Sequence, residues 1–333
     1  MKRVLLTGAA GFFGSHLLRH LLVNTDWEFV CICSWKHKGT PERVENAING
    51  QDWHRVKIIT HDLKSPLTEM TKKRLGKIDY ILNIASNSDV FLSEKEPRRF
   101  IEENTALALN MLELAREIQP EVFLQFSTDE VYGAAPKGVK HKEWSPIIPS
   151  NPYSASKANQ ENNAISWWRT FGVPVIITNT MNLTGETQAP EKYPAMLLRK
   201  INNGETVTVH GSPTDIGSRF YLHARNGADA VLFILKNLPP KLYNKGENDR
   251  PDRYNIVGDL ELNNLEIAQM TAKILGKELK YEFVDFHAAR SGHDRRYALD
   301  GSKLKDLGWK APMEFEESLR NTISWTLKNP KWL

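Results

Sequence analysis

The sequence has only two cysteines, no long apolar run and no strong excess of either charge. Cys31 and Cys33 stand two residues apart inside the apolar run 29–33, so they would share one face of a strand rather than bridge distant segments. No apolar run approaches the ~20 residues of a membrane helix, and the residues before the first Thr-Gly turn are too few for a signal peptide. We therefore expect a reduced, cytoplasmic protein without a membrane segment.

The charge balance is nearly even. The chain has 44 Lys and Arg against 40 Asp and Glu, a net charge of +4 without the clustered basic tract of a nucleic-acid-binding protein. With 41% hydrophobic and 25% charged residues, the composition excludes disordered and collagen-like classes. At ~100–200 residues per domain, the 333 residues favour two domains or one large one with an insertion. We expect a globular protein that binds no nucleic acid and needs no metal.

Short β-branched or apolar runs alternate with longer segments of helical periodicity along the first 180 residues. This alternation is typical of a parallel sheet covered by helices on both faces. The predicted strands are 3–6, 28–33, 56–60, 80–84, 122–127 and 173–178, and the predicted helices are 13–23, 41–48, 97–119 and 152–171.

The pattern becomes irregular after about residue 182. Helices are predicted near 193–203, 224–236, 263–275 and 316–328, with short strands at 207–210 and 254–257. Such a segment would close over the carboxyl ends of the strands, where ligands of open α/β sheets bind. We therefore predict an α/β fold: a doubly wound parallel sheet in residues 1–180, a later segment of about 215–257 that returns to its edge, and a smaller α/β substrate-binding domain in residues 181–333.

A glycine-rich loop follows the first predicted strand. Residues 7–14 read Thr-Gly-Ala-Ala-Gly-Phe-Phe-Gly, so that Gly8, Gly11 and Gly14 have the spacing G-x-x-G-x-x-G. Such glycines allow a tight turn and let a pyrophosphate approach the N-terminus of the next helix. A plain strand-to-helix turn is the alternative, but the strand before the loop and the helix after it favour a dinucleotide site.

The second predicted strand lacks the acid that usually binds the adenosine ribose of a dinucleotide. Its end reads Cys-Ser-Trp-Lys-His-Lys over residues 33–38. A hydroxyl at Ser34 followed by the basic Lys36 suits the 2′-phosphate of NADP, and a basic loop at the sheet edge explains the same residues equally well. The cofactor is therefore predicted as NAD or NADP, with Asp62 and Leu63 beside the adenine ring.

Tyr153 and Lys157 are separated by one turn of a predicted helix. A nearby cation lowers the pKa of a phenol from ~10 towards neutrality, so the phenolate can take a proton from a substrate hydroxyl while the same carbon is oxidised. Alone, such a pair is more often a solvated helical pair. Together with a glycine loop about 140 residues upstream it indicates dehydrogenase chemistry.

Residues 7–14 and 153–157 together resemble the extended short-chain dehydrogenase/reductase superfamily. Three further stretches closely resemble its nucleotide-sugar 4,6-dehydratases, best known with a thymidine diphosphate substrate: Ser-Thr-Asp-Glu-Val-Tyr-Gly at 127–133, Pro-Glu-Lys at 190–192 and Gly-His-Asp-Arg-Arg-Tyr-Ala-Leu-Asp at 292–300. This resemblance spans nearly the whole chain. It implies a Rossmann-type domain, a tightly bound NAD or NADP that is recycled in each turnover, a nucleoside-diphosphate sugar substrate, and a homodimer formed through helices 97–119 and 152–171.

The resemblance also implies the reaction: oxidation of a hexose at C4, loss of water across C5 and C6, and reduction at C6. Tyr153 would act at C4 with Lys157 and Thr128 in support. Glu130 would remove the C5 proton, and Asp129 would protonate the departing C6 hydroxyl, because adjacent acids can hold different protonation states. Taken alone, the triplet is better explained as a helix N-cap at Thr128 followed by two ordinary first-turn acids.

The family's epimerases and decarboxylases generally lack this acid pair, which favours dehydration. A related epimerase, a dehydratase of other regiochemistry and a non-catalytic dinucleotide-binding protein are the alternatives. Departures around the nucleotide and the sugar, such as Asn179 in place of the usual arginine, leave the base and the hexose open.

Further contacts follow from the glycine loop and the resemblance together. Those to the cofactor are Gly8, Gly11, Phe12, Phe13, Gly14, Ser34, Lys36, Asp62, Leu63, Ala85, Tyr153 and Lys157. Those to the substrate are Ser88, Thr128, Asn182, Lys192, Arg219, Asn255 and His293. Arg219 is the expected diphosphate partner, because a guanidinium binds phosphate oxygens bidentately.

Overall fold

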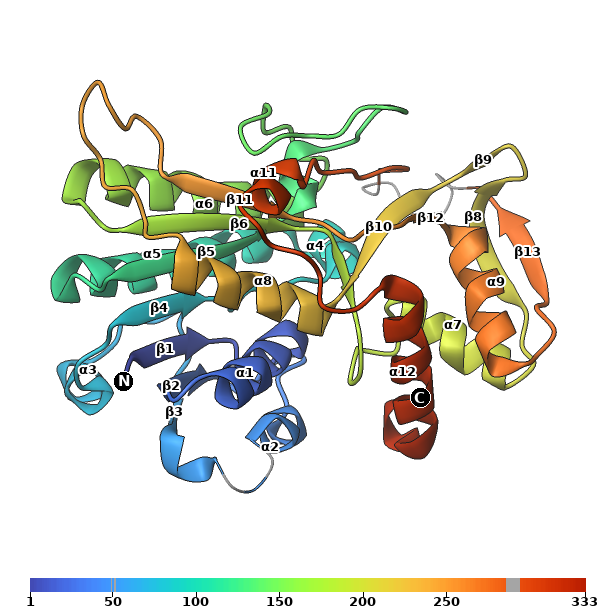
Figure 1. The fold of residues 1–333 in the computed structure, drawn as a ribbon, viewed down its shortest axis with the longest axis horizontal. Coiled ribbons are helices and arrows are strands. Elements are labelled where there is room, and N and C mark those ends of the chain that lie inside the picture. Colours follow the sequence, from blue (N-terminus) through green and yellow to red (C-terminus); the bar gives the residue numbers. More distant parts are fainter. Residues whose placement is uncertain (49, 51, 286–293) are drawn as a thin grey trace.

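A seven-stranded parallel sheet forms the centre of the protein (Figure 1). The computed structural model describes all residues except 49, 51 and 286–293. The strand order is β11-β6-β5-β4-β1-β2-β3, and every neighbouring pair is parallel. The strands are β1 (Arg3–Thr7), β2 (Glu28–Cys33), β3 (Val56–Thr60), β4 (Tyr80–Asn83), β5 (Val122–Thr128), β6 (Val175–Thr180) and β11 (Asp252–Ile256).

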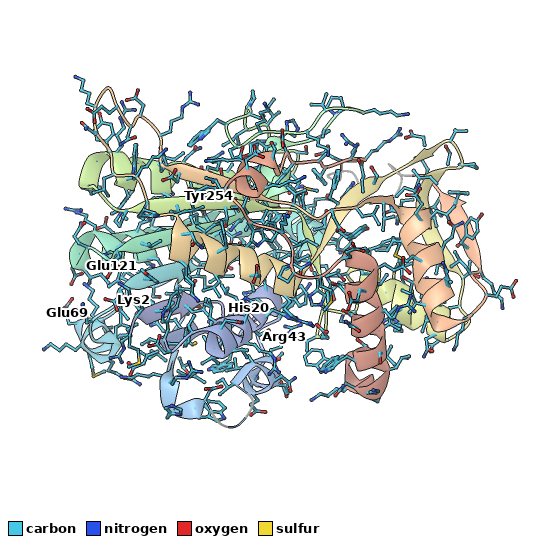
Figure 2. All side chains as sticks on the ribbon, viewed as in Figure 1. Lys2, His20, Arg43, Glu69, Glu121 and Tyr254 are labelled. Carbon is cyan, nitrogen blue, oxygen red and sulfur yellow. The ribbon has the colours of Figure 1, made fainter. Side chains whose placement is uncertain are left out.

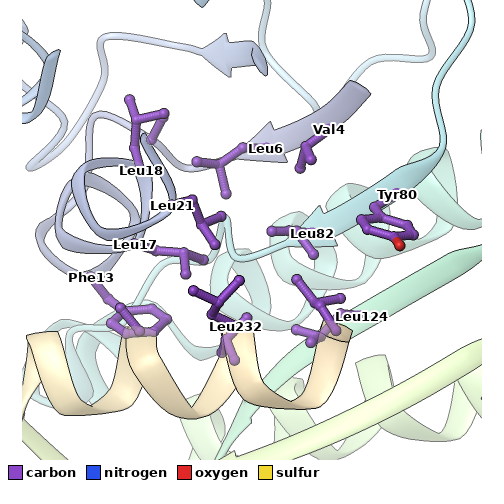
Figure 3. Close-up of a cluster of buried hydrophobic side chains, with 14 of the residues drawn as sticks. Val4, Leu6, Phe13, Leu17, Leu18, Leu21, Tyr80, Leu82, Leu124 and Leu232 are labelled. Atoms are coloured by element: carbon purple, nitrogen blue, oxygen red, sulfur yellow. The ribbon is translucent and has the colours of Figure 1, made fainter. Parts of the chain in front are cut away.

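Helices cover both faces of this sheet because successive side chains of a strand point to opposite faces. Val4 and Leu6 of β1 pack in one apolar cluster with α1 and α8, where Leu232 of α8 lies opposite the strands (Figure 3). Leu5 packs in the other cluster, with α3, α5 and α6. The helices of this part of the chain, on both faces of the sheet, are α1 (Phe12–Asn24), α2 (Pro41–Ile48), α3 (Glu69–Leu75), α4 (Val90–Lys95), α5 (Pro97–Ile118), α6 (Pro152–Phe171) and α8 (Ala224–Asn237). Two 3-10 turns accompany them, η1 (Trp53–Arg55) and η2 (Asp129–Tyr132).

A smaller part of the chain packs at one end of the sheet around its own apolar cluster, drawn from α7, β8, β10, α9 and α12 (Figure 1). It contains two three-stranded sheets, β12-β10-β7 and β13-β8-β9. The elements are β7 (Asn182–Thr184), α7 (Tyr193–Asn202), β8 (Val207–Ser212), β9 (Asp215–Ile216), β10 (Ser218–His223), β12 (Glu261–Asn263), α9 (Asn264–Leu275), β13 (Tyr281–Val284), α12 (Phe315–Lys328) and η3 (Pro330–Trp332). The short helix α11 (Ser302–Asp306) packs instead on β11 of the main sheet.

A side chain of α2 joins the two parts. Arg43 donates from Nη2 to the carbonyl oxygen of Thr187 at 2.7 Å, and its guanidinium lies 5.3 Å from the Trp332 ring (Figure 2). Within the main part, His20 of α1 lies 3.4 Å from Asp229 of α8 (Figure 2). Arg43 therefore fixes the loop after β7 and the C-terminal 3-10 turn to α2.

The sheet reverses its order at β1, whose neighbours are β2 and β4. Ligands of open α/β sheets bind at such a point, beyond the carboxyl ends of the strands. Gly8, the residue after β1, has φ +72°, and a Cβ there would lie 2.9 Å from the backbone nitrogen of Ala85. A Cβ on Gly14 would lie 2.0 Å from the carbonyl oxygen of Gly8. Only glycines allow α1 and the loops after β1 and β4 to approach this closely.

The predicted α/β fold with a doubly wound parallel sheet is confirmed. Helices α3, α4 and α11 and five strands of the smaller part were not predicted. The helices and the strands β7, β9, β12 and β13 are too short to show a periodicity, whereas β10 is as long as β2 and was missed. Of residues 215–257, which were expected to return to the sheet edge, α8 packs on the main sheet and β11 pairs with β6 at its edge. The stretch before α8 does not return, because β10 pairs with β7 and β12 of the smaller part.

The structure also bears on the cysteines and on the absence of long apolar runs. Cys31 and Cys33 are buried in β2 and neither forms a disulfide bond. Across the described residues, no helix combines the length and the apolar character needed to cross a bilayer.

Candidate active site

A cleft of about 980 Å³ runs along the carboxyl ends of the central strands and continues to the smaller part, where Tyr193, Tyr221 and Tyr297 line it. Its size suits an extended ligand, since single-ligand pockets span ~300–1,000 Å³. All predicted cofactor contacts line it: Gly8, Gly11, Phe12, Phe13, Gly14, Ser34, Lys36, Asp62, Leu63, Ala85, Tyr153 and Lys157. The structure thus brings together residues that are up to 149 positions apart (157 − 8 = 149).

The start of α1 has the features of an anion site. Its N-cap, Gly11, has no side chain to accept hydrogen bonds from the first turn, and that turn contains no acidic residue. The free N–H groups and the positive end of the helix dipole are therefore uncompensated by the chain's own side chains. These residues fit the pyrophosphate of a dinucleotide.

Three ion pairs that the sequence did not predict are formed by the basic loop after β2. Lys36 after β2 binds Asp62 after β3, with 2.8 Å between Nζ and Oδ2. Lys38 binds Asp89 at 2.9 Å and also Glu191, so it links the loops after β2 and β4 to the loop before α7. The partners of Lys38 are 51 and 153 residues away, and sequence spacing gives no signal for such contacts.

The acid pair lies at the end of β5, where Thr128 completes the strand and η2 begins. Thr128 Oγ1 donates to Asp129 Oδ1 at 2.9 Å, and Asn151 Nδ2 donates to Glu130 Oε2 at 3.2 Å. Asn151 is also the N-cap of α6. One side chain therefore fixes Glu130 to the helix that carries Tyr153 and Lys157. Asn151 was missed, although Asn followed by Pro is a recognisable helix start.

The two carboxyls have different surroundings. Burial and the neighbouring charge of Glu130 raise the pKa of Asp129 to about 7. Burial also raises the pKa of Glu130, but the Asn151 hydrogen bond and the charges of Arg219 and Lys192 oppose that change. These partners favour the proton on Asp129 and the charge on Glu130. Asp129 Oδ2 is buried and makes no hydrogen bond with the described part of the chain.

Tyr153 and Lys157 project from the first turns of α6 and both are buried. Burial and the charges of Glu130 and Asp129 raise the pKa of Tyr153, while its hydrogen bond with Thr128 opposes the rise. Burial lowers the pKa of Lys157 to about 7. In the protein alone, burial and the adjacent acids thus oppose the lowering of the tyrosine pKa that the spacing of Lys157 predicts.

Five of the predicted substrate contacts also line the cleft: Ser88, Thr128, Asn182, Lys192 and Arg219. Lys192 Nζ donates to the carbonyl oxygen of Ser88 at 3.3 Å, and burial lowers the pKa of this lysine. The Arg219 guanidinium donates to three backbone carbonyls, those of residues 218, 294 and 295, and lies 4.4 Å from the Tyr297 ring. Backbone contacts therefore hold this cation at the cleft.

Asn255 is not brought to the cleft. It lies on β11 and is fully buried, and its Nδ2 donates to the carbonyls of His141 and Asp300, both at 3.0 Å. This side chain holds two loops against the sheet, so its predicted contact with the substrate needs correction. His293 lies outside the described residues. Within the described ranges, no three His, Cys, Asp or Glu side chains group as a metal site requires.

Comparison with known proteins gives matches over nearly the whole chain. A family model described as GDP-mannose 4,6 dehydratase matches residues 5–322. The low-salt glycan biosynthesis protein Agl12 of Haloferax volcanii is 33% identical over 97% of this chain and 98% of that protein. The dTDP-glucose 4,6-dehydratase 1 of Escherichia coli is 31% identical over 99% of this chain and 94% of that protein. The solved structure of a dTDP-glucose 4,6-dehydratase of Bacillus anthracis in complex with NAD matches with a TM-score of 0.85 and 28% identity. The match covers 100% of this chain and 98% of that one.

The raised pKa of Asp129 predicts a pH-dependent stability. Its pKa rises from 3.8 to about 7 on folding, so the folded chain binds this proton more tightly, and the associated stability is lost as the pH rises from ~4 to ~7. Asp129→Asn removes the cost of burying the charge. We expect the variant to exceed the wild type in free energy of unfolding by a few kcal/mol at pH 8, with the gap closing towards pH 4.

Urea unfolding at both pH values measures this difference, with the exposed Asp249→Asn as control. A constant difference between Asp129→Asn and wild type across this range would contradict the assignment.

Proposed function

The chain belongs to the GDP-mannose 4,6 dehydratase family of nucleotide-sugar dehydratases, within the extended short-chain dehydrogenase/reductases, and on that premise we propose that it dehydrates a nucleoside-diphosphate hexose to the 4-keto-6-deoxy sugar. The observation that carries the proposal is the meeting of Asp129 and Glu130 with Tyr153 in one cleft. A 4-epimerase needs proton transfer at the C4 hydroxyl only and would leave this acid pair without a task.

We propose NAD or NADP as the cofactor, held by the glycine loop at the start of α1 and by Lys157. The NAD bound to the Bacillus anthracis relative supports this. When bound, the oxidised dinucleotide would accept the C4 hydrogen with its electron pair, return it at C6, and place a positive charge near Tyr153. That charge would oppose the effects that raise the pKa of Tyr153 in the protein alone.

At C4, the Tyr153 oxygen would accept the proton of the sugar hydroxyl as C4 is oxidised to a ketone. The Thr128 hydroxyl donates its single hydrogen to Asp129 in this structure, and it would stabilise the ionised phenol by donating to the Tyr153 oxygen instead. Lys157 would add a positive charge on the same side of α6. The three residues lie on β5 and α6, so the strand end and the helix start position them together.

The ketone at C4 acidifies the C5 hydrogen, which the Glu130 carboxylate would accept. As the C5–C6 double bond forms, the C6–O bond breaks and Asp129 would give its proton to the departing hydroxyl, which leaves as water. On reduction at C6, Glu130 would give a proton back to C5, after its carboxyl proton has exchanged with water. The proton that Tyr153 took replaces the one that Asp129 gave, so the net change is the loss of one water.

We propose a dTDP- or UDP-glucose type of substrate, in line with the dTDP-glucose 4,6-dehydratases among the relatives. Lys192 and Arg219 are the cations at the cleft that would face the diphosphate. Ser88 and Asn182 would bind sugar or nucleotide hydroxyls. We further propose a homodimer formed through α5 and α6, which would cover Ile101 and Ile118 of α5, each 36% exposed in the single chain. We also propose that the protein is cytoplasmic.

The proposed function is tested by incubating the purified protein with thymidine- and uridine-diphosphoglucose and either dinucleotide. We expect the base-induced absorbance of a 4-keto product. Glu130→Gln should still oxidise C4, seen as absorbance of the reduced cofactor, because Tyr153 is intact. It should lose exchange of the C5 hydrogen with deuterated water, and its turnover should fall by ~100-fold or more. Formation of a 4-epimer, or no product from any nucleotide hexose, would contradict the proposal.

The strand end after β2 allows a test of cofactor preference. Ser34→Asp places a carboxylate where a 2′-phosphate would lie, so we expect NADP to bind at least ~tenfold more weakly. NAD binding should stay within ~threefold, because an acid at this point accepts hydrogen bonds from a free ribose. Calorimetric titration with both dinucleotides measures the two affinities. Equal losses for NAD and NADP would show that the adenosine ribose does not lie at Ser34.

A further inference from the structure

The Lys157 ammonium is held by two acceptors inside the protein. Its Nζ donates to the carbonyl oxygen of Phe126 on β5 at 2.7 Å and to Oε1 of Gln160, one turn along α6, at 2.6 Å. Lys157 is 2% exposed and Gln160 is fully buried. An ammonium has three donors, so these two bonds leave one N–H of Lys157 for the cleft that this lysine lines.

The orientation of the Gln160 amide is fixed by other buried groups. Its Oε1 also accepts from Gln125 Nε2 at 3.0 Å, while its Nε2 donates to the carbonyl oxygen of Asn104 on α5 at 2.7 Å. A flipped amide would turn a donor towards Lys157 and lose all three bonds. The oxygen of Gln160 is therefore held towards the ammonium by neighbours on β5 and α5.

The same row of amides reaches the glycine loop. Gln125 Oε1 accepts from Asn83 Nδ2 at 2.9 Å, and Asn83 Oδ1 accepts from Thr7 Oγ1 at 3.0 Å. Thr7 directly precedes Gly8, and its hydroxyl also accepts from the backbone nitrogen of Ala85 at 3.0 Å. A continuous line of hydrogen bonds thus joins the turn that would hold the pyrophosphate to Lys157.

We infer that Gln160 is a positioning residue for the proposed reaction: it fixes the Lys157 ammonium relative to the glycine loop and leaves one of its N–H groups facing the cleft. This rests on the proposed function, in which Lys157 holds the cofactor and supports Tyr153. Gln160 itself touches neither ligand. Its action passes through Lys157, so it should alter catalysis and dinucleotide binding without changing how the sugar is held.

The charges around Lys157 decide the sign of the effect. Glu161 of the same helix is the charged group that acts on Lys157, and its carboxylate is paired with Arg253 of β11. Tyr153, Asp129 and Glu130 line the same cleft, whereas β5 and α5 face Lys157 and Gln160 with the neutral carbonyls of Phe126 and Asn104. Replacing Gln160 by an apolar residue leaves the ammonium with one acceptor in a buried place, which favours the neutral amine. Replacing it by a carboxylate favours the charged amine. The two substitutions should therefore shift the titration of Lys157 in opposite directions.

The experiment compares Gln160→Met with Gln160→Glu. With Met, we expect the alkaline limb of the kcat profile to move to lower pH by about one unit and kcat at pH 8 to fall ~tenfold, with the sugar KM nearly unchanged. With Glu, the limb should move to higher pH. Gln125→Met removes a hydrogen bond to Gln160 and none to Lys157. It should therefore move the alkaline limb in the same direction as Gln160→Met, but by less. Thermal unfolding of each variant separates these effects from lost stability.

Thr271→Val serves as the matched control, because it removes a buried hydrogen bond on α9 far from the cleft. The dissociation constant of NAD between pH 6 and 9, measured by calorimetry, should show the same opposite shifts as kcat. Variants that lose stability but keep the wild-type pH dependence, or that shift it in the same direction, would overturn the inference. Wild-type protein that converts no nucleotide hexose would instead contradict the proposed function, and the binding titration would still decide the role of Gln160.

Discussion

The burial of two adjacent carboxyls at the end of β5 is the constraint on which the rest of the site depends. Asp129 is 2% exposed, and Glu130 beside it is half-buried and lines the cleft. Two charges cannot be held there together at low cost, so one carboxyl keeps a proton near neutral pH. Asn151 and the cations of the cleft stabilise the charge of Glu130. This asymmetry favours a protonated and an ionised carboxyl side by side, as the proposed reaction requires.

Buried polar groups behind β5 hold this pair in place. Asn179 on β6 donates to the carbonyl oxygen of Thr128 at 3.1 Å and to Glu161 at 2.7 Å. Glu161 in turn forms a fully buried ion pair with Arg253 of β11, with 2.8 Å between Nη2 and Oε2. Removing one partner of such a pair leaves an uncompensated buried charge. The residue that departs from the usual arginine, Asn179, therefore has a structural task behind the acids.

Much of this arrangement follows from the sequence because its causes are local. Three short-range patterns carried the prediction: strand-to-helix alternation, the glycine spacing and the one-turn separation of Tyr153 from Lys157. They predicted the sheet, and the residues expected to contact the cofactor line one cleft of the folded chain. Long-range pairings had no such signal. The Lys38 ion pairs and the burial of Asn255 depend on how distant loops pack.

The pKa of Tyr153 is a second property that local sequence patterns do not predict. The spacing of the lysine predicted a lowered pKa, but the sign depends on burial and on acids from another element, which only the folded chain brings together. Short side-chain patterns thus identified the chemical groups, while their protonation is a property of the whole cleft.

The transfer of an isotope within the sugar tests the central claim most directly. A nucleoside-diphosphoglucose labelled with deuterium at C4 is incubated with the protein in ordinary water, and the product is examined by NMR. If the cleft carries out oxidation, dehydration and reduction on one bound sugar, the deuterium will appear at C6 of a 4-keto-6-deoxy product. Deuterium that remains at C4, in substrate or in its epimer, would contradict the account.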